Sequence, residues 1–561
     1  MLQSAGNPLG FGASDFLLFF LAGLFLLFAV LWKPALQARI ARFAEKTVWC
    51  MLLLAALPVA LRLLLLPHHP VPTSDIYDEF SHLLVADTLL HFRFANPPHP
   101  LHQFFETFFV LQQPTYSSIY PIGQGLILAL GRLISGIAWT GVVLSVAAFC
   151  AVCYWMLRAW TTPVWALLGG MLAVIEFGPL NLWMNCYWGG ALGATAGCLV
   201  FGSLPRLERS WKRRYALLLG AGFAIHMLTR PFESTLLLAS IVLFFAPVLR
   251  YREKWPVLAR AAGFALLATA PAVLITLVQN KQVTHNWMTL PYALSQYQYG
   301  VPATLTFQKN AVPHVPLTPQ QALDYKAQAL THGGRDTPER FLLRLIYRIR
   351  YYRFFFLPPL YIALVAFFFA FRQKHFVWIL GTLAIFALGT NLFPYLLVHY
   401  LSGITCLFVL VSVMGLRQLA RINVRSTLVG WEVVRILVLL CFAHFVFWYG
   451  LHLFENAPFS FAMMRYETWD AINHQNPVQR IAVSKQLAAI PGKLLVFVRY
   501  WPNHIFQNEW VWNAADIDSS RIVWARDLGT AENEKLLRYY PDRKPFLLEP
   551  DARPAILTPL K

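Results

Sequence analysis

Acidic residues are scarce in this chain, and charged residues of either sign are few. Only 13% of the 561 residues are charged, with 27 Asp and Glu against 46 Lys and Arg, while 57% are hydrophobic. The mean hydropathy of +0.51 excludes an ordinary soluble globular protein. Apolar runs of bilayer length recur, and each must be helical because lipid offers no partner for backbone polar groups. The composition therefore predicts a polytopic α-helical protein of the lipid bilayer.

Neither a disulfide framework nor a zinc-binding cysteine pattern is present. The seven cysteines lie in or beside apolar runs, and only Cys150 and Cys153 form a closely spaced pair. This distribution favours packing in the core. Residues 1–14 hold no Lys or Arg, and no small-residue cleavage site follows the first apolar run. We therefore expect no cleavable signal peptide.

The excess of positive charge, +19 at pH 7, lies in short loops between apolar runs. Such clusters orient membrane proteins, so they do not indicate a nucleic-acid partner. A basic loop follows a predicted helix at 15–32 and is expected in the cytoplasm, so the next helix, 48–66, leads to the other side. Long outer loops follow at 67–120 and 280–355. Residues 1–454 are predicted to hold about 12 to 13 transmembrane helices.

The number of apolar runs after the first outer loop conflicts with the charge pattern. Runs at 122–138, 141–157, 163–180 and 187–204 lead to a loop with five basic residues, which is expected in the cytoplasm. Four crossings that start outside would end outside. We therefore predict that 122–138, which contains Arg132, is a re-entrant or surface helix.

The first outer loop contains two amphipathic pieces, which are separated by prolines. Residues 78–94 have helical spacing of apolar side chains, and residues 101–110 are rich in phenylalanine. Both pieces are expected to lie in the membrane interface with their apolar faces toward lipid.

The tail, residues 455–561, has more charge and shorter apolar runs. Strands are predicted at 493–500, 522–525 and 545–548, and a helix at 533–540. This pattern predicts a small soluble α/β domain on the outer side of the membrane.

Three carboxylates, Asp75, Asp78 and Glu79, stand where the second predicted helix leaves the membrane. Acids at that junction are costly unless they are solvated, paired or functional. Asp78 is the first candidate for a general base, with Glu79 as its neighbour or alternate, and Asp75 is a solvated loop acid. The alternative is that Asp78 and Glu79 stabilise a helix N-terminus.

Arg230 is the candidate for binding a phosphate group, because positive charge is not expected at the outer end of a predicted helix. A guanidinium can bind phosphate through two parallel hydrogen bonds. Alternatively, Arg230 pairs with Glu233 or reaches lipid headgroups. His399 and Tyr400 are candidates for reaching the same phosphate, or are interfacial anchors.

The chain resembles the GT-C superfamily of membrane glycosyltransferases over about residues 48–416. The resemblance rests on Asp78-Glu79 in the first outer loop, on the Tyr120-Pro-x-x-Gln124 turn, and on the segment 393–400, Phe-Pro-Tyr-Leu-Leu-Val-His-Tyr. Within this superfamily, the chain looks like the protein O-mannosyltransferases and the lipid A aminoarabinose transferase.

The resemblance implies an inverting transfer of a sugar from a polyprenyl-phosphate donor to a lipid, glycan or protein acceptor. The reaction would take place outside the cytoplasm of a bacterial inner membrane, with the tail in the periplasm and no cofactor. It implies Asp78 or Glu79 as the base, and Tyr120 and Gln124 near the substrate. A carboxylate base contributes typically about 10²–10⁴ in rate, and the departing lipid phosphate needs a cation or dipole nearby.

The chain departs from this family in one respect. Relatives often place a second acid in the next outer turn, but residues 181–190 contain none. Asn185 and Tyr187 are possible neutral substitutes, and Glu106 could contribute from the first loop. A divalent metal is possible but not expected, because the histidines of that loop match no established ligand spacing.

Two other functions are compatible with the sequence. A transporter or flippase for a lipid-linked or polar solute would place acids and broken helices near the bilayer midplane. Here the acids cluster outside the predicted membrane segments and no internal repeat is visible. A noncatalytic assembly factor with the same fold is the second alternative.

Overall fold

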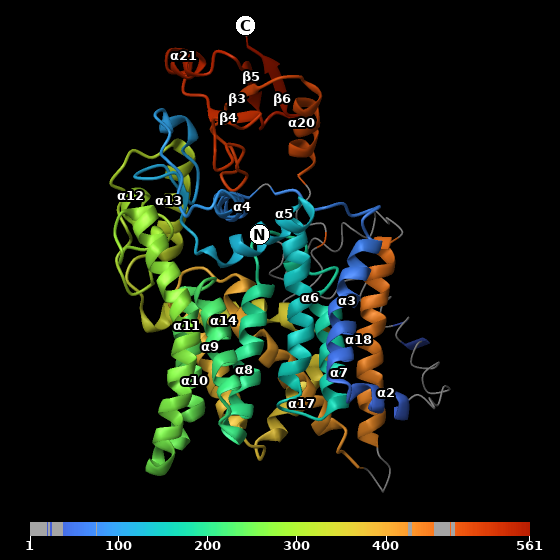
Figure 1. Cartoon of the computed structure of the whole chain (residues 1–561). Coiled ribbons are helices and arrows are strands. Elements are labelled where there is room, and N and C mark those ends of the chain that lie inside the picture. Colours follow the sequence, from blue (N-terminus) through green and yellow to red (C-terminus); the bar gives the residue numbers. More distant parts are fainter. Residues whose placement is uncertain are drawn as a thin grey trace.

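The computed structural model describes residues 20, 23–24, 37–74, 76–423, 429–453, 472 and 477–560. Figure 1 shows a bundle of roughly parallel helices with the C-terminal domain on one of its ends. The predicted helix at 15–32, the acid Asp75 and the proposed boundary between 454 and 455 lie outside the described residues or at their edge.

Among the residues that the structure describes, six helical segments are long and apolar enough to cross a membrane. They contain α3 (Thr47–Leu64), α6 (Ala138–Leu157), α10 (Pro231–Phe245), α11 (Trp255–Thr284), α17 (Thr405–Leu419) and α18 (Val429–Leu453). A seventh candidate is a pair of segments bent by 116°, Pro338–Phe355 and Pro358–Ala370. These helices confirm the polytopic α-helical fold class.

Several further apolar helices are shorter. These are α5 (Ile122–Ser135), α7 (Pro163–Phe177) and α16 (Phe376–Thr390). Helices α8 (Ala191–Ser210) and α9 (Arg213–Met227) also stand in the bundle in Figure 1. Among the expected crossings, α7, α9 and α16 have only 15 residues each, shorter than a full membrane span. The expected helix at 15–32 lies largely outside the described residues.

Outside the C-terminal domain, the described chain contains six further α-helices, two of which belong to the bent pair. They are α2 (Gln37–Ala44), α4 (Tyr77–Leu90), α12 (Pro291–Tyr299), α13 (Pro319–His332), α14 (Pro338–Arg348) and α15 (Tyr361–Phe367). A 3₁₀ segment, η9 (Val398–Ile404), leads into α17. Two short strands, β1 (Val110–Leu111) and β2 (Ser117–Ser118), pair antiparallel in the first outer loop.

Helix α5 lies beside α4 at the end of the bundle near the C-terminal domain (Figure 1). Its 14 residues span about 21 Å, less than the ~30 Å of a bilayer core. Arg132 near its C-terminus forms an ion pair with Asp87 of α4, with 2.9 Å between Nη1 and Oδ1. This placement supports the prediction that residues 122–138 do not cross the membrane.

The prediction that the two amphipathic pieces of the first outer loop turn their apolar faces toward lipid was wrong. Phe104 and Phe105 are buried together with Leu84 of α4 in one cluster with Leu495 and Phe497 of the C-terminal domain. The sheet of that domain therefore covers the apolar faces that the pattern had assigned to lipid. Periodicity identifies an apolar face but not what packs against it.

The C-terminal domain contains a four-stranded sheet in the order β4-β3-β5-β6. Strands β3 (Leu494–Val498), β4 (Ile522–Arg526) and β5 (Lys544–Glu549) are parallel, and β6 (Ile556–Pro559) is antiparallel to β5. Helices α20 (Val478–Ala489) and α21 (Thr530–Tyr539) flank it. Three strands and α21 lie where the sequence predicted them, whereas α20 and β6 were not predicted.

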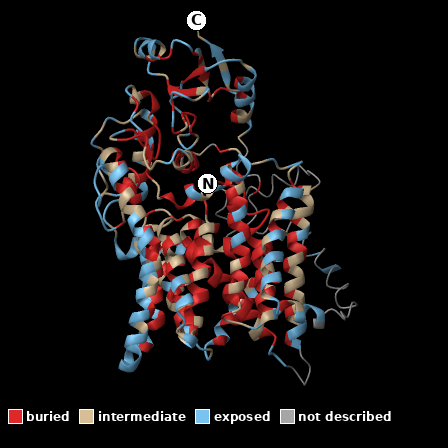
Figure 2. Ribbon diagram, in the orientation of Figure 1, coloured by how far each residue is buried: buried red, intermediate tan, exposed pale blue. Residues whose placement is uncertain are grey.

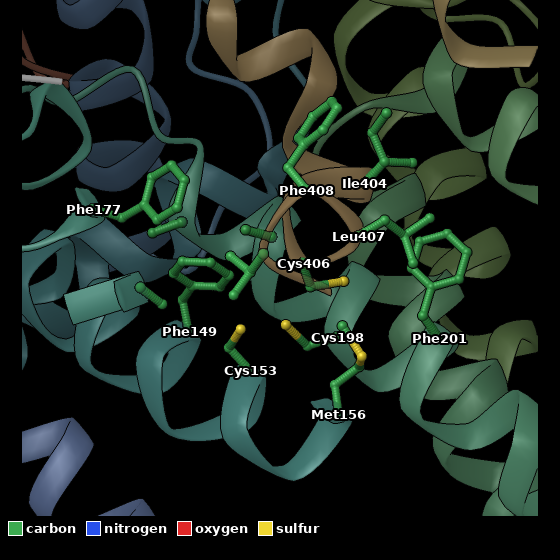
Figure 3. Packing of buried hydrophobic residues seen from close by; sticks show 14 of the residues in the cluster. Phe149, Cys153, Met156, Phe177, Cys198, Phe201, Ile404, Cys406, Leu407 and Phe408 are labelled. Atoms are coloured by element: carbon green, nitrogen blue, oxygen red, sulfur yellow. The ribbon is translucent and has the colours of Figure 1, made fainter. Parts of the chain in front are cut away.

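Figure 2 shows buried residues along the inner sides of the bundle helices. Many of them form one large apolar cluster. Figure 3 shows Cys153 of α6, Cys198 of α8 and Cys406 of α17 pointing toward one another among phenylalanines. All seven cysteines are free and buried, as expected for cysteines that pack in a core.

Candidate functional site

A cavity of about 420 Å³ lies where the outer loops meet the bundle. Its wall is built from the start of α4, the start of α5, the α9–α10 junction, the α11–α12 segment and η9. Six of the residues that the sequence analysis selected line this cavity: Asp78, Tyr120, Gln124, Arg230, His399 and Tyr400.

Asp78 belongs to the first turn of α4, which starts at Tyr77. The hydroxyl of Tyr120 donates a hydrogen bond to Oδ1 of Asp78. Burial beneath the molecular surface raises the pKa of Asp78 to about 6, although the Tyr120 hydrogen bond and the nearby charge of Arg230 favour the ionised form. A carboxyl group with a pKa near neutrality is suited to accept a proton during a reaction.

Arg230 lies at the sharp junction between α9 and α10, where Pro231 begins the second helix. Its guanidinium lies over the ring of Tyr400, 4.7 Å from the ring centroid. Within the described chain, no carboxylate lies within 4.0 Å of this group, and Glu233 lines the same cavity without forming an ion pair. The positive charge of Arg230 is therefore available to an anion in the cavity.

Gln124, His399 and Tyr400 complete the predicted part of the wall. The amide of Gln124 donates to the carbonyl oxygen of Tyr187 at 2.9 Å. The ring of His399 lies 5.6 Å from that of Trp188 and 5.0 Å from that of Tyr400. These contacts position the α7–α8 loop and η9 beside the same cavity.

Glu79, Asn185 and Tyr187 do not line the cavity. Oε1 of Glu79 accepts a hydrogen bond of 2.7 Å from the backbone N–H of Tyr187, whose own hydroxyl donates to Pro72. Oδ1 of Asn185 accepts from the guanidinium of Arg62 at 2.8 Å. All three residues connect the loop between α7 and α8 to neighbouring segments, so the structure places them behind the wall.

Glu106 lies outside the cavity, in the contact between the first outer loop and the C-terminal domain. Its carboxylate is 3.8 Å from the imidazole of His102 and accepts a hydrogen bond of 3.4 Å from Gln321. Its backbone oxygen accepts from Arg526. Glu106 therefore lies among contacts that join the first outer loop to α13 and to the C-terminal domain.

Sequence reasoning missed several polar residues of the cavity or its surroundings, namely His82, Glu233, Tyr292 and Asp324. His82 was weighed only as a metal ligand, although its position one helical turn after Asp78 indicates the same face. Burial, with a smaller contribution from the charge of Asp78, raises the pKa of Asp324 on α13 to about 7, although a hydrogen bond from Gln328 favours the ionised form. No local pattern in the long loop indicates that α13 approaches Asp78.

No group of three or more His, Cys, Asp or Glu side chains is arranged to hold a metal ion among the residues that the structure describes. The expectation of a reaction without a metal therefore stays a prediction.

Comparison with known proteins gives a similarity of fold. No protein-family model and no curated protein sequence matches the chain. The structure of ArnT from Cupriavidus metallidurans bound to undecaprenyl phosphate is similar with a TM-score of 0.50 at 12% identity, covering 89% of this chain and 92% of that one. The apo structure of that protein gives a TM-score of 0.52 at 12% identity, covering 90% and 93%. The chain therefore has the GT-C fold that its sequence resemblance predicted.

Proposed function

We propose that the protein is a glycosyltransferase that moves a sugar from a polyprenyl-phosphate donor to an acceptor on the extracytoplasmic side of a membrane. One observation carries this proposal. A single cavity contains a carboxyl group of raised pKa, Asp78, and an arginine without a carboxylate partner in the described chain, Arg230. The fold shared with ArnT, a protein solved with undecaprenyl phosphate, supports the choice of donor.

The reaction is a single displacement at the anomeric carbon. The acceptor oxygen or nitrogen attacks this carbon while its proton passes to the carboxylate of Asp78. The bond from the carbon to the phosphate oxygen breaks, and its electron pair stays on the phosphate. Arg230 stabilises the charge that develops there. One displacement inverts the anomeric configuration, so the product is expected to have the configuration opposite to that of the donor.

The basic residues support the proposed side of the membrane. Arg209, Lys212 and Arg213 lie at the α8–α9 turn, at the end of the bundle away from the C-terminal domain (Figure 1). Lys374 is bound there to Glu208 at 2.8 Å. By the positive-inside rule this end faces the cytoplasm. The cavity and the C-terminal domain would then face the periplasm of a bacterial inner membrane, where a lipid, glycan or protein acceptor is reached.

The test is sugar transfer by the purified protein in lipid, with radiolabelled polyprenyl-phosphate sugars and a membrane extract as the source of acceptor. Asp78→Asn is expected to lower transfer by about 10²–10⁴ while donor binding persists, and Arg230→Ala to weaken donor binding. Asp542→Asn and Arg538→Ala change exposed residues of the C-terminal domain and serve as controls.

Unchanged transfer in Asp78→Asn would exclude this residue as the base. A wild-type protein that transfers no sugar from any donor but moves a lipid across the bilayer would support a transporter or flippase instead. The anomeric configuration of the product, read by NMR, tests inversion.

A further inference from the structure

His82 lies in the wall of the cavity beside the residues proposed for the chemistry. It follows Asp78 by one turn of α4, so both side chains are on the same face of this helix. Its ring is stacked on that of Tyr120, with 4.2 Å between centroids and 21° between planes. Tyr120 is also the donor to Asp78. His82 therefore adjoins the proposed base without bonding to it.

Neither ring nitrogen of His82 has a hydrogen-bond partner within the described chain, and Nδ1 is buried without one. The residue is only 8% exposed. By contrast, Nδ1 of His226 is bound to Ser234 at 2.7 Å, and both ring nitrogens of His504 have partners. Because buried polar groups are nearly always hydrogen-bonded, an imidazole without a partner in a cavity wall indicates a partner that enters the cavity.

The imidazole is neutral at physiological pH. Burial and, as a smaller contribution, the charge of Arg230 together lower the pKa of His82 to about 3. A neutral imidazole offers one donor and one acceptor and adds no charge. Uncharged polar side chains also line this space: Gln124, Thr229, Gln279, Asn280, Gln296 and Ser402. Such a wall suits a group with several hydroxyls.

We infer that His82 is a specificity-determining residue that hydrogen-bonds a hydroxyl group of the substrate in this cavity. The inference rests on the proposed glycosyl transfer and names what the site selects, an uncharged hydroxyl-bearing group. Two sources can supply this hydroxyl, the sugar of the donor or the acceptor.

The experiment compares donors with their deoxy analogues, each lacking one ring hydroxyl, and measures kcat and KM for the wild type, His82→Phe and His82→Asn. Phenylalanine keeps an aromatic ring against Tyr120 but cannot form the hydrogen bond, whereas asparagine keeps a polar group. The wild type is expected to prefer one hydroxyl-bearing donor over its deoxy analogue by about tenfold or more. His82→Phe should reduce this ratio to about one, and His82→Asn should restore part of it.

Two arms of the experiment separate the sources of the hydroxyl. Hydrolysis of the donor in the absence of an acceptor involves the donor sugar alone. If His82→Phe loses the preference for the hydroxyl-bearing donor in hydrolysis as fully as in transfer, the hydroxyl belongs to the donor. A loss confined to acceptors and their deoxy analogues assigns it to the acceptor. His91→Phe, at the exposed C-terminal end of α4, is the control.

Discrimination that is unchanged in both His82 variants would overturn the role of His82 while leaving the proposed function intact. A wild type that transfers no sugar to any acceptor, or to water, would overturn the proposed function itself. A purely structural role would lower the stability of His82→Phe without changing the ratio between a substrate and its deoxy analogue.

Discussion

The cavity in the bundle and the C-terminal domain hold their charged side chains in different ways. In the cavity, Asp78 and Arg230 have no oppositely charged partner within 4.0 Å in the described chain. In the domain, the carboxylate of Glu509 accepts from Tyr500 and from the backbone N–H groups of Trp510 and Val511. Buried charges with complete sets of partners stabilise a fold, whereas charges left open in a cavity indicate a place for a ligand.

The paired charges of the domain also join it to the bundle. Arg526 of β4 lies 3.8 Å from Glu509, donates to the backbone of Glu106 in the first outer loop, and donates to Gln320 of α13 at 2.7 Å. The hydroxyl of Thr107 donates to Glu509. The domain that composition sets apart is therefore bonded to both outer loops around the cavity.

The largest expected effect is the loss of sugar transfer when the carboxylate of Asp78 in the cavity is removed. Because burial raises the pKa of Asp78 from 3.8 to about 6 and the base must be ionised, transfer is expected to rise with pH through about 6. Asp78→Asn should lose about 10²–10⁴ in rate and also lose this pH dependence. Rates between pH 4.5 and 8 at saturating donor measure both. The same pH profile in Asp78→Asn would assign the titration to another group.

On the side of the C-terminal domain, Arg526→Ala should cost roughly 3–5 kcal/mol, because it leaves the buried Glu509 without its cation. We expect the domain to become sensitive to limited proteolysis and its unfolding to occur at lower temperature. Arg538→Ala is the control, because this exposed arginine pairs with Glu534 on the surface of α21. Equal stability of the two variants would contradict a joining role for Arg526.

Asp324 is a buried acid near the cavity, and it has no cation to stabilise its ionised form within 4.0 Å in the described chain. Its pKa, about 7 in the fold against an ordinary 3.8, means that the folded state binds the proton more tightly. The stability from Asp324 is complete below pH 3.8 and is lost as the pH rises through about 7, by roughly 2–4 kcal/mol. Asp324→Asn should remove this decline. The free energy of unfolding from pH 5 to 8 measures it, and parallel curves for both proteins would contradict it.

The smallest effect is expected at the ion pair between Arg132 and Asp87. Arg132→Ala should cost at most about 1 kcal/mol, since the pair is partly exposed. Asp87→Ala should cost more, because Oδ2 of Asp87 also accepts from the backbone of Ala515 at 2.6 Å. Thermal unfolding of the two variants tests this order.

The same ion pair allows a test of topology. Arg132→Cys and Asp516→Cys are expected to react with a membrane-impermeant thiol reagent from the same side. Reaction from opposite sides would place residue 132 across the membrane from the domain.

The sequence identified part of the site for a definite physical reason. Asp78 and Arg230 were found because charge next to apolar runs is costly and stands out in a chain with few charges. Glu79 and Asn185 are also polar residues next to apolar runs, yet both form hydrogen bonds that fix the α7–α8 loop, Glu79 with Tyr187 and Asn185 with Arg62. Asp78 and Glu79 are adjacent in α4, yet only Asp78 faces the cavity, because successive residues of a helix point in different directions around its axis. Composition does not determine which of the two faces the cavity.

By itself, the sequence determined that this is a membrane protein and which ends of its helices carry charged residues. Both depend on the free energies of transfer from water to lipid, which add up along the chain. Only the tertiary structure decided that the phenylalanines of the first outer loop pack under the C-terminal sheet, that α13 approaches Asp78, and that His82 lies in the cavity wall without a partner in the described chain. These contacts join residues far apart in sequence, and their energies depend on which surfaces meet.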